Sequence, residues 1–189
     1  MVDEERIAEL LAAGDSRAAA EAVIRGYGPE ILGYLTRVLR SADDAADALS
    51  FWAEDVWRGM GTFQGRSSVR VWSYRVAANS AARVAGEAWK RRRERMRTTM
   101  ASRIAADVRS TTATSRDREA GELDRLRHSL SEEELQLLVL RVDRRLSWRE
   151  VAEVLAREGD PVDEMAVRKR FERLKAKLGK LAKEKGLLR

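Results

Sequence analysis

The side chains that most often carry out chemistry are scarce in this sequence. It contains no cysteine and one histidine, His128, and nothing near that histidine completes a metal site. Three carboxylates, Asp43, Asp44 and Asp47, are close enough in sequence to suggest a metal site, but their position just after Ser41 favours a role as helix-capping and dipole partners. With no phosphate-cradling glycine loop and no nucleophile elbow, we expect no catalysis, no metal and no cofactor.

The clearest chemical pattern is the cluster of basic residues near the C-terminus, where positions 168–189 hold ten basic and two acidic side chains. At roughly 100° per residue, one apolar stripe is formed by Val167, Phe171, Leu174 and Leu178. Lys169 and Arg173 then fall on the opposite face, with Arg168 and Arg170 on its flanks. This arrangement predicts a recognition helix, in which the far face reads base edges and the flanks contact phosphates. An ordinary amphipathic helix with a basic exposed face is the simpler alternative.

Charge is unevenly distributed along the rest of the chain, although the net charge is only +6. Residues 61–100 hold ten basic and two acidic side chains, whereas residues 1–60 hold twelve acidic and six basic ones. Two separate basic blocks suggest two contacts with a polyanion. The acidic first third suggests a partner other than nucleic acid, and the alternative is that these runs are merely solvated helix faces.

These residues must be positioned by helices, because the chain has two prolines and many good helix formers. Helical periodicity predicts helices over 4–13 and 16–40, with Pro29 marking either a kink or a boundary in the second. Ser41 and the following acidic residues predict the start of a third helix, which ends at the glycines around position 60. Either Ser67 or Ser68 can cap a fourth, long helix that runs into the basic cluster at 90–93.

Periodicity fades after this helix, and a Ser/Thr-rich stretch at 110–115 predicts a linker. Capping boxes at 131–134 and 147–150 begin two further helices, and Asp163 can cap the last one. Two helices joined by a glycine-containing turn, the second strongly basic, predict a helix-turn-helix. We therefore expect an all-α protein of two small helical domains, 1–97 and 123–189, joined by a flexible linker at 98–122.

Nothing in the sequence indicates a membrane or export. No apolar run reaches the length of a membrane span, and the acidic start of the chain lacks the basic and apolar regions of a signal peptide. A cytoplasmic location is the expectation.

Two groups of motifs resemble the extracytoplasmic-function sigma factors, and the resemblance runs from about residue 26 to residue 186 apart from the linker. Residues 63–79, FQGRSSVRVWSYRVAAN, are similar to that family's Phe-Arg-Gly-x-Ser…Trp-Leu-Tyr-Arg-Ile-Ala-x-Asn segment. Residues 146–155, LSWREVAEVL, and residues 166–173, AVRKRFER, are similar to the two helices of its second domain. The order of these motifs along the chain is also that of the family.

The resemblance implies a role for several residues. In the first domain, Phe63, Arg66, Asn79 and Arg83 would contact the unpaired strand of the −10 element, with Asn79 lining a pocket for a flipped base. In the second domain, the recognition helix would read the duplex −35 element. The helix over 44–58 would dock on the clamp helices of core RNA polymerase through Asp47 and Glu54. From periodicity alone, Asn79 is equally well explained as a partly buried, hydrogen-bonded amide.

The sequence departs from the family pattern in two places. Ser50 and Phe51 stand where the family usually has Gln-Glu on the clamp-binding helix. The turn over 156–164 is also longer than usual, so that either the helix before it gains a turn or the turn bulges.

We conclude from the sequence that this protein is a dissociable promoter-recognition subunit rather than an enzyme. Its expected partners are core RNA polymerase and promoter DNA, and an anti-sigma factor is a further candidate. A helix-turn-helix regulator that does not bind polymerase is the main alternative, and residues 63–79 argue against it. A structural or RNA-binding helical protein with a basic tail is a third class.

Overall fold

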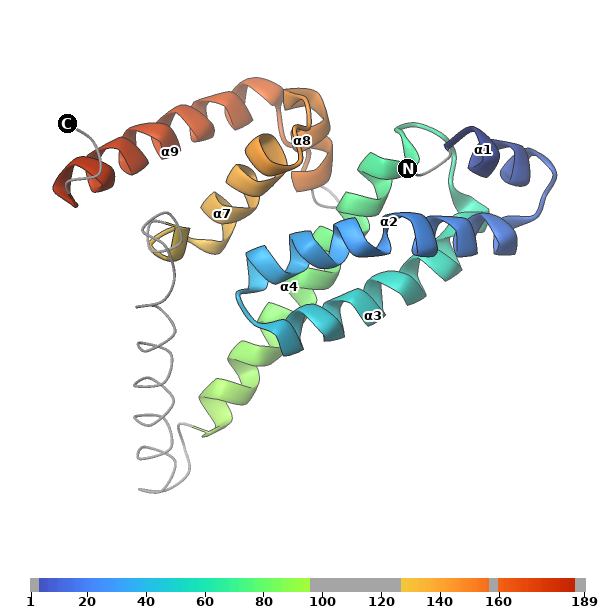
Figure 1. The fold of residues 1–189 in the computed structure, drawn as a ribbon, viewed down its shortest axis with the longest axis horizontal. Helices are drawn as coiled ribbons and strands as arrows, with labels where there is room; N and C mark the ends of the chain where they lie inside the picture. Colours follow the sequence, from blue (N-terminus) through green and yellow to red (C-terminus); the bar gives the residue numbers. More distant parts are fainter. Residues whose placement is uncertain (1–3, 96–126, 157–159, 186–189) are drawn as a thin grey trace.

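A computed structural model describes residues 4–95, 127–156 and 160–185, and every regular element in these ranges is a helix. The expected all-α fold is therefore confirmed. The first half comprises α1 (Glu4–Ala12), α2 (Ser16–Leu39), α3 (Ala42–Gly59), the 3-10 turn η1 (Met60–Thr62) and α4 (Val69–Arg95). The second half comprises α7 (Glu132–Leu138), the π-helical turn η2 (Val139–Asp143), α8 (Trp148–Leu155) and α9 (Glu164–Glu184) (Figure 1). The expected linker at 98–122 lies outside the described residues.

Side-chain caps begin the helices of the first half where the sequence predicts them. The Ser41 hydroxyl accepts a hydrogen bond from the backbone N–H of Asp44 at 3.2 Å, and Asp43 and Asp44 lie in the first turn of α3. Of the two serines at the start of α4, Ser68 accepts from the N–H of Val71 at 3.2 Å. Ser41 is therefore the cap, and the carboxylates of Asp43 and Asp44 lie where they interact favourably with the helix dipole.

The long helix α2 runs through Pro29 without interruption, so this proline marks no boundary. The helix ends at Arg40, which adopts a left-handed conformation with φ of 57° and donates its backbone N–H to the Thr36 carbonyl at 3.1 Å. Such a residue closes the helix and turns the chain sharply. The turn allows α3 to pack back along α2.

Helices α2, α3 and α4 form a bundle with a fully buried core, and α1 packs on the start of α2. Trp52 of α3 lies at its centre and donates its indole N–H to the Ser73 carbonyl at 3.1 Å. Tyr34 of α2 and Tyr74 of α4 meet edge to face, with ring centroids 5.3 Å apart. These contacts hold α4 against the two preceding helices and fix which of its faces reaches solvent.

The second half begins its two short helices with complete capping boxes, as the sequence predicts. Ser131 and Glu134 exchange side-chain and backbone hydrogen bonds at the start of α7, and Ser147 and Glu150 do the same at the start of α8. Asp163 accepts from the N–H of Ala166 at 3.3 Å and begins α9. The helix-turn-helix formed by α8 and α9 is thus present as expected.

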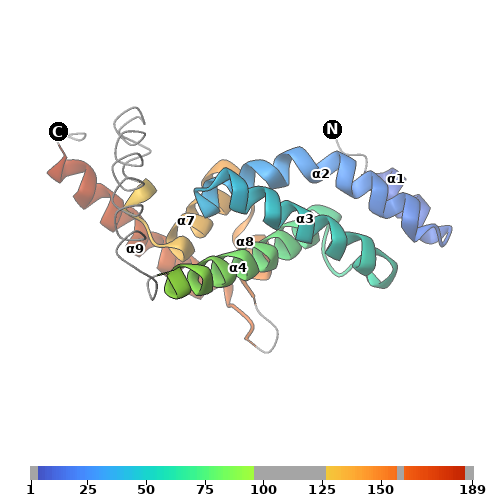
Figure 2. The same ribbon diagram turned by 90° about the horizontal axis from the view of Figure 1, so that it is seen from below.

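The two halves are in contact in this structure. Helix α8 lies against α4 and α7 lies against α2, and both contacts are visible in two perpendicular views (Figures 1 and 2). Buried side chains of α4, such as Val69, and of α8, such as Val151, belong to one continuous apolar core. The division into domains at 1–97 and 123–189 remains a prediction from the sequence.

Candidate nucleic-acid interface

Helix α9 presents the basic face that the sequence predicts. Its apolar stripe turns inward, with Val167 and Leu174 buried and Phe171 and Leu178 packed at the edge of the core. Lys169 and Arg173 are exposed on the other side. Because the stripe fixes the rotation of the helix, these two side chains point away from the protein into solvent.

A cluster of aromatic and arginine side chains attaches α9 to α8. The ring of Trp148, the first residue of α8, packs edge to face on Phe171 with centroids 5.2 Å apart. The Arg141 guanidinium covers the Trp148 ring at 4.3 Å and donates to the Leu146 carbonyl at 2.7 Å. Arg168 lies 6.0 Å from the same ring and pairs with Glu164 at 2.6 Å. Arg168 is thus held on the flank of the helix, as expected for a phosphate contact.

An ion pair connects α9 with α7. Lys177 donates to Glu134 at 2.6 Å. This hydrogen bond from Lys177, together with that from the Ser131 N–H, holds the pKa of the Glu134 carboxyl below its ordinary value. The bond couples the C-terminal part of α9 to a helix distant in sequence and helps to hold the orientation of α9.

The long turn before α9 does not lengthen α8, which ends at Leu155 and is followed by Ala156 in an extended conformation. Residues 157–159 lie outside the described part of the chain. Of the two explanations that the sequence allows, an extra helical turn is therefore wrong. The residues from Asp160 to Asp163 are non-helical, so the additional length belongs to the connection.

The second predicted DNA site lies on the loop before α4 and on α4 itself. Phe63 is half-buried against Trp72, with ring centroids 5.4 Å apart, whereas Arg66 is exposed beside Gly65, whose φ is +65°. Asn79 is exposed on α4. The alternative interpretation of Asn79 as a partly buried amide is therefore wrong, and its polar edge is available to a ligand.

Arg83 lies one turn after Asn79 and is oriented by two neighbours. Its guanidinium lies over the ring of Phe51 on α3, 3.9 Å from the centroid, and its Nε is 3.8 Å from the Glu87 carboxylate. Phe51 is one of the two residues of this helix that depart from the family pattern, and sequence reasoning did not connect it with Arg83. Only the packing of α3 against α4 brings the two together, so no sequence signal identifies this pair.

A network of polar side chains anchors the beginning of α4, close to the 63–68 loop. Arg70 donates to Glu30 at 2.6 Å and Tyr74 donates to the same oxygen at 2.7 Å. Burial opposes ionisation of Glu30, but these two hydrogen bonds outweigh it and hold the pKa of Glu30 below its ordinary value. Burial also raises the pKa of Tyr74, so that its hydroxyl stays a donor. Glu4 of α1 completes the network by accepting from the Arg70 N–H at 3.2 Å.

The predicted polymerase-binding residues lie on the outer side of α3. Asp47 and Glu54 are both exposed, two turns apart, and Glu54 pairs with Arg58 at 2.7 Å. Ser50 is exposed between them and donates its hydroxyl to the Ala46 carbonyl at 3.1 Å. Trp57 continues the same row and is 50% exposed. Sequence reasoning missed Trp57, although its spacing of seven from Ser50 and three from Glu54 is the signal that would have found it.

The predicted sites thus fall on separate surfaces: α9, the 63–83 region, and the outer row of α3. Within the described residues, no group of three or more metal-ligating side chains comes together. In the same part of the chain, no helix combines the length and apolar character that crossing a membrane requires.

Comparison with known proteins identifies the first half of the chain. Residues 23–95, which span most of α2 and all of α3 and α4, match the model of sigma-70 region 2. The match concerns this segment, which is less than half of the chain. Phe63, Arg66, Asn79 and Arg83 all lie within the matched sigma-70 segment, as do Asp47 and Glu54. The family resemblance seen in the sequence is therefore confirmed, while the roles of these residues remain predictions.

Two individual proteins extend the comparison. The RNA polymerase sigma-H factor of Pseudomonas aeruginosa is 32% identical over 78 residues, which are 41% of this chain and 40% of that protein. The matched part is thus about two fifths of that sigma factor's length. The structure of CnrH in complex with the cytosolic domain of CnrY is similar with a TM-score of 0.60 and 23% identity, over 96% of this chain and 99% of the matched chain. This likeness extends the fold comparison to both halves.

Proposed function

We propose that this protein is a sigma factor of the extracytoplasmic-function type, which directs core RNA polymerase to promoters and catalyses no reaction itself. One observation carries the proposal: a sigma-70 region 2 segment at 23–95 is followed in the same chain by a helix-turn-helix with an exposed basic recognition helix. A helix-turn-helix regulator that does not bind polymerase would need no region 2 segment. The structure-based likeness over nearly the whole chain supports the same arrangement.

Each surface has a task in this proposal. The outer row of α3 docks on polymerase, where Asp47 and Glu54 supply charge and Trp57 supplies an exposed aromatic of the kind that anchors protein interfaces. The 63–83 region captures the unpaired −10 strand. Unstacked bases need polar edge contacts and aromatic or guanidinium faces, and Asn79 and Arg83 offer both.

Helix α9 reads the −35 duplex in this proposal. Exposed Lys169 and Arg173 face the base edges, while Arg168 and Arg170 contact phosphates on either side. The protein acts in the cytoplasm, where polymerase and DNA are found. The structure of CnrH is that of a complex with the cytosolic domain of CnrY; by analogy, we propose that this protein also has a protein partner, an anti-sigma factor.

The decisive experiment is transcription by core RNA polymerase on a library of random promoters, with and without this protein. We expect a set of enriched sequences with two elements at fixed spacing. An Arg173→Ala variant should lose selection at the upstream element and an Asn79→Ala variant at the downstream one. DNA binding without any polymerase-dependent initiation would instead favour the regulator, and an absence of sequence preference would favour a general nucleic-acid-binding protein.

A further inference from the structure

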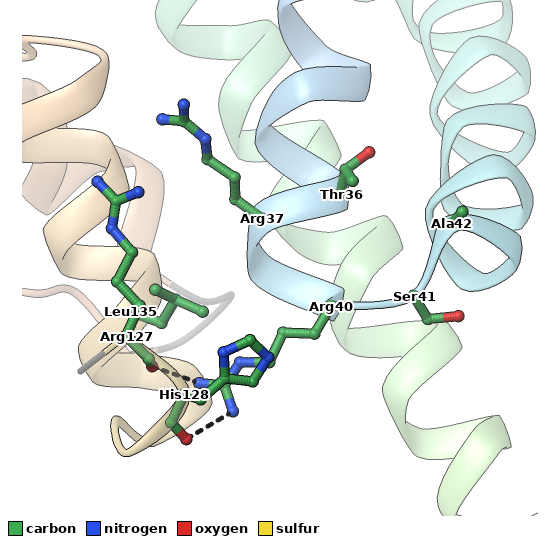
Figure 3. A pocket seen from close by; sticks show the side chains of 8 residues that line it. All are labelled: Thr36, Arg37, Arg40, Ser41, Ala42, Arg127, His128 and Leu135. Atoms are coloured by element: carbon green, nitrogen blue, oxygen red, sulfur yellow. Dashed lines mark hydrogen bonds between the residues drawn. The ribbon is translucent and has the colours of Figure 1, made fainter. Parts of the chain in front are cut away.

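The arginines at the end of α2 are engaged by other parts of the protein. Arg40 donates to three backbone carbonyl oxygens of the turn at 127–130, at distances of 2.7, 3.1 and 3.2 Å. Figure 3 shows this side chain reaching the turn from the end of α2. Arg37 pairs with Asp143, whose side chain is only 12% exposed. Although these arginines line a hollow, their guanidinium groups are bound by the protein's own oxygen atoms, so this cluster serves the fold.

The basic side chains on the outer face of α9 are engaged differently. Lys169 and Arg173 are exposed, and neither forms a hydrogen bond or an ion pair with another described residue. Of the two clusters, the one on α9 is therefore free to bind a ligand. A ligand that approaches this face must also meet the side chains around Lys169 and Arg173.

Two acidic side chains border the outer face of α9, and each is paired with a base on the same helix. Glu164 accepts from Arg168 at 2.6 Å, and Glu172 lies 2.8 Å from the ammonium of Lys175. These partners balance part of the negative charge, so the carboxylates repel a phosphate backbone less than unpaired ones would. The face between them can therefore approach DNA closely.

Met165 stands on this same face, at the beginning of α9. It is the second residue of the helix and is 62% exposed, more than any other large apolar side chain in the described part of the chain. At roughly 100° per residue it lies opposite the buried Val167 and Leu174 and on the side of Lys169, one turn later. In helix-turn-helix proteins, the N-terminal residues of the recognition helix are the ones that contact base edges. Met165 thus occupies a position from which bases are read.

The chemistry of the Met165 side chain restricts what it can recognise. It has no hydrogen to donate, so it cannot bind a phosphate as Lys169 can. Among the four bases, thymine alone presents a methyl group in the major groove, and apolar side chains recognise that group by contact. An unbranched thioether side chain with three rotatable bonds adapts easily to such a contact. A thymine methyl is therefore the feature of the groove that suits Met165.

The spacing along α9 also places this thymine relative to a neighbouring base. Met165 and Lys169 are four residues apart, which is about 6 Å along the helix axis. At a rise of 3.4 Å per base pair, this distance covers about two base pairs. A lysine bonds the edge of guanine, so the thymine should lie within about two base pairs of a guanine.

We propose that Met165 is a specificity-determining residue of α9, which recognises a thymine by its C5 methyl group close to the guanine that Lys169 contacts. The proposal rests on the DNA-reading function proposed above for α9. Uracil has the same hydrogen-bonding edge as thymine and lacks only the methyl group. Burial of one methyl group predicts a preference of about fourfold for thymine over uracil at this one position.

The test uses the full chain, with and without core polymerase, and the upstream element enriched from random DNA. Each thymine of that element, on either strand, is replaced in turn by deoxyuridine, and the affinity for each duplex is measured by titration. We expect the wild-type protein to lose about fourfold in affinity at one thymine and nothing at the others. Met165→Ala should bind the unmodified duplex about fourfold more weakly and should no longer distinguish thymine from deoxyuridine there.

Two further variants separate the methyl contact from general effects. Met165→Leu keeps an apolar side chain of similar volume and should retain the preference for thymine. The matched control is Val142→Ala, which shortens an apolar side chain that is 50% exposed and lies outside α9. It should show the same loss with deoxyuridine as the wild type. Circular dichroism of each variant checks that the helices are retained.

The outcomes distinguish this proposal from the function on which it rests. Equal affinity of the wild type for thymine and deoxyuridine at every position would overturn the role of Met165, as would an enriched element without thymine. A loss that persists unchanged in Met165→Ala would overturn it too. A preference for the methyl group that depends on Met165, without any polymerase-dependent initiation, would uphold it and refute the sigma-factor function. An absence of any sequence preference would refute both.

Discussion

Arg173 and Arg168, five residues apart on α9, should give different phenotypes when each is replaced by alanine. Arg173 is exposed on the side opposite the buried Val167 and Leu174, and a guanidinium there can bond a guanine edge. Loss of one such contact costs roughly 1–3 kcal/mol of discrimination, or about 5- to 150-fold at one base pair. The preference should relax at one or two adjacent positions of the −35 element and remain elsewhere.

Arg168 should instead affect all sequences alike. It lies on the flank of α9, close to Trp148 and paired with Glu164, so its expected contact is a phosphate. Removal of one phosphate contact lowers the slope of log affinity against log salt by at most about 0.9. Glu164 already neutralises part of the Arg168 charge in the free protein. The loss of DNA affinity in Arg168→Ala should therefore be smaller than the loss of a fully charged phosphate contact would cause.

The assay is a binding selection on randomised duplexes at several salt concentrations, with the full-length protein. The control is Arg6→Ala, which removes an arginine of α1 that likewise pairs with a nearby glutamate on its own helix. Arg6→Ala changes the net charge by the same amount as Arg168→Ala, but at a position far from α9 in the chain. If Arg168→Ala altered the preferred sequence while Arg173→Ala changed only overall affinity, the rotation of α9 deduced from its apolar stripe would be refuted.

Further predictions concern the first half and the linker. Asp47→Arg should weaken binding to core polymerase and leave binding of a −35 duplex unchanged, as measured by separate titrations. Phe51→Leu should reduce capture of −10 single strands by about two- to fivefold, the size of an exposed cation–π contact, and should have no effect once Arg83→Ala is present. The pKa of Glu30 is lowered in the folded protein, so ionised Glu30 stabilises the fold above pH 4.5, and this stabilisation is lost as the pH falls through the pKa of the folded state. Glu30→Gln should therefore make the free energy of unfolding, measured by denaturant titration, depend less on pH below 4.5. Light proteolysis should cut first within 98–122, and early cleavage within α4 would contradict the predicted domain division.

Local signals in the sequence were sufficient for most of the fold. Caps at Ser41, Ser131, Ser147 and Asp163 all form, because each requires only a hydrogen bond to a backbone group three residues later. The rotation of α9 was also predictable from the sequence, since an apolar stripe must face whatever core is nearby. Family-type motifs added the proposed contacts of the 63–83 region with the −10 strand, which periodicity alone did not reveal.

Asn79 shows where periodicity fails. Its spacing of seven from Trp72 places it near the apolar stripe, but Trp72 lies at the margin of the buried face and is itself only half-buried. Where that margin ends depends on how α4 packs against its neighbours. The contact of Arg37 with Asp143 was equally out of reach, because 106 residues separate the two in the chain. Such pairings are properties of the tertiary arrangement.

The π-helical turn η2 contains one residue more than an ordinary helical turn, which changes the direction in which the side chains after it point. The Arg144 N–H bonds the carbonyl of Val139, five residues back instead of four, so one extra residue is accommodated within a helical turn. Deletion of a single residue there would restore an ordinary helix and rotate the residues after it by roughly 100°. Asp143 and Arg144 would then turn away from α2 while α8 and α9 kept their own sequence. A single-codon deletion would therefore change the contact of this segment with α2 without changing any residue of the helix-turn-helix.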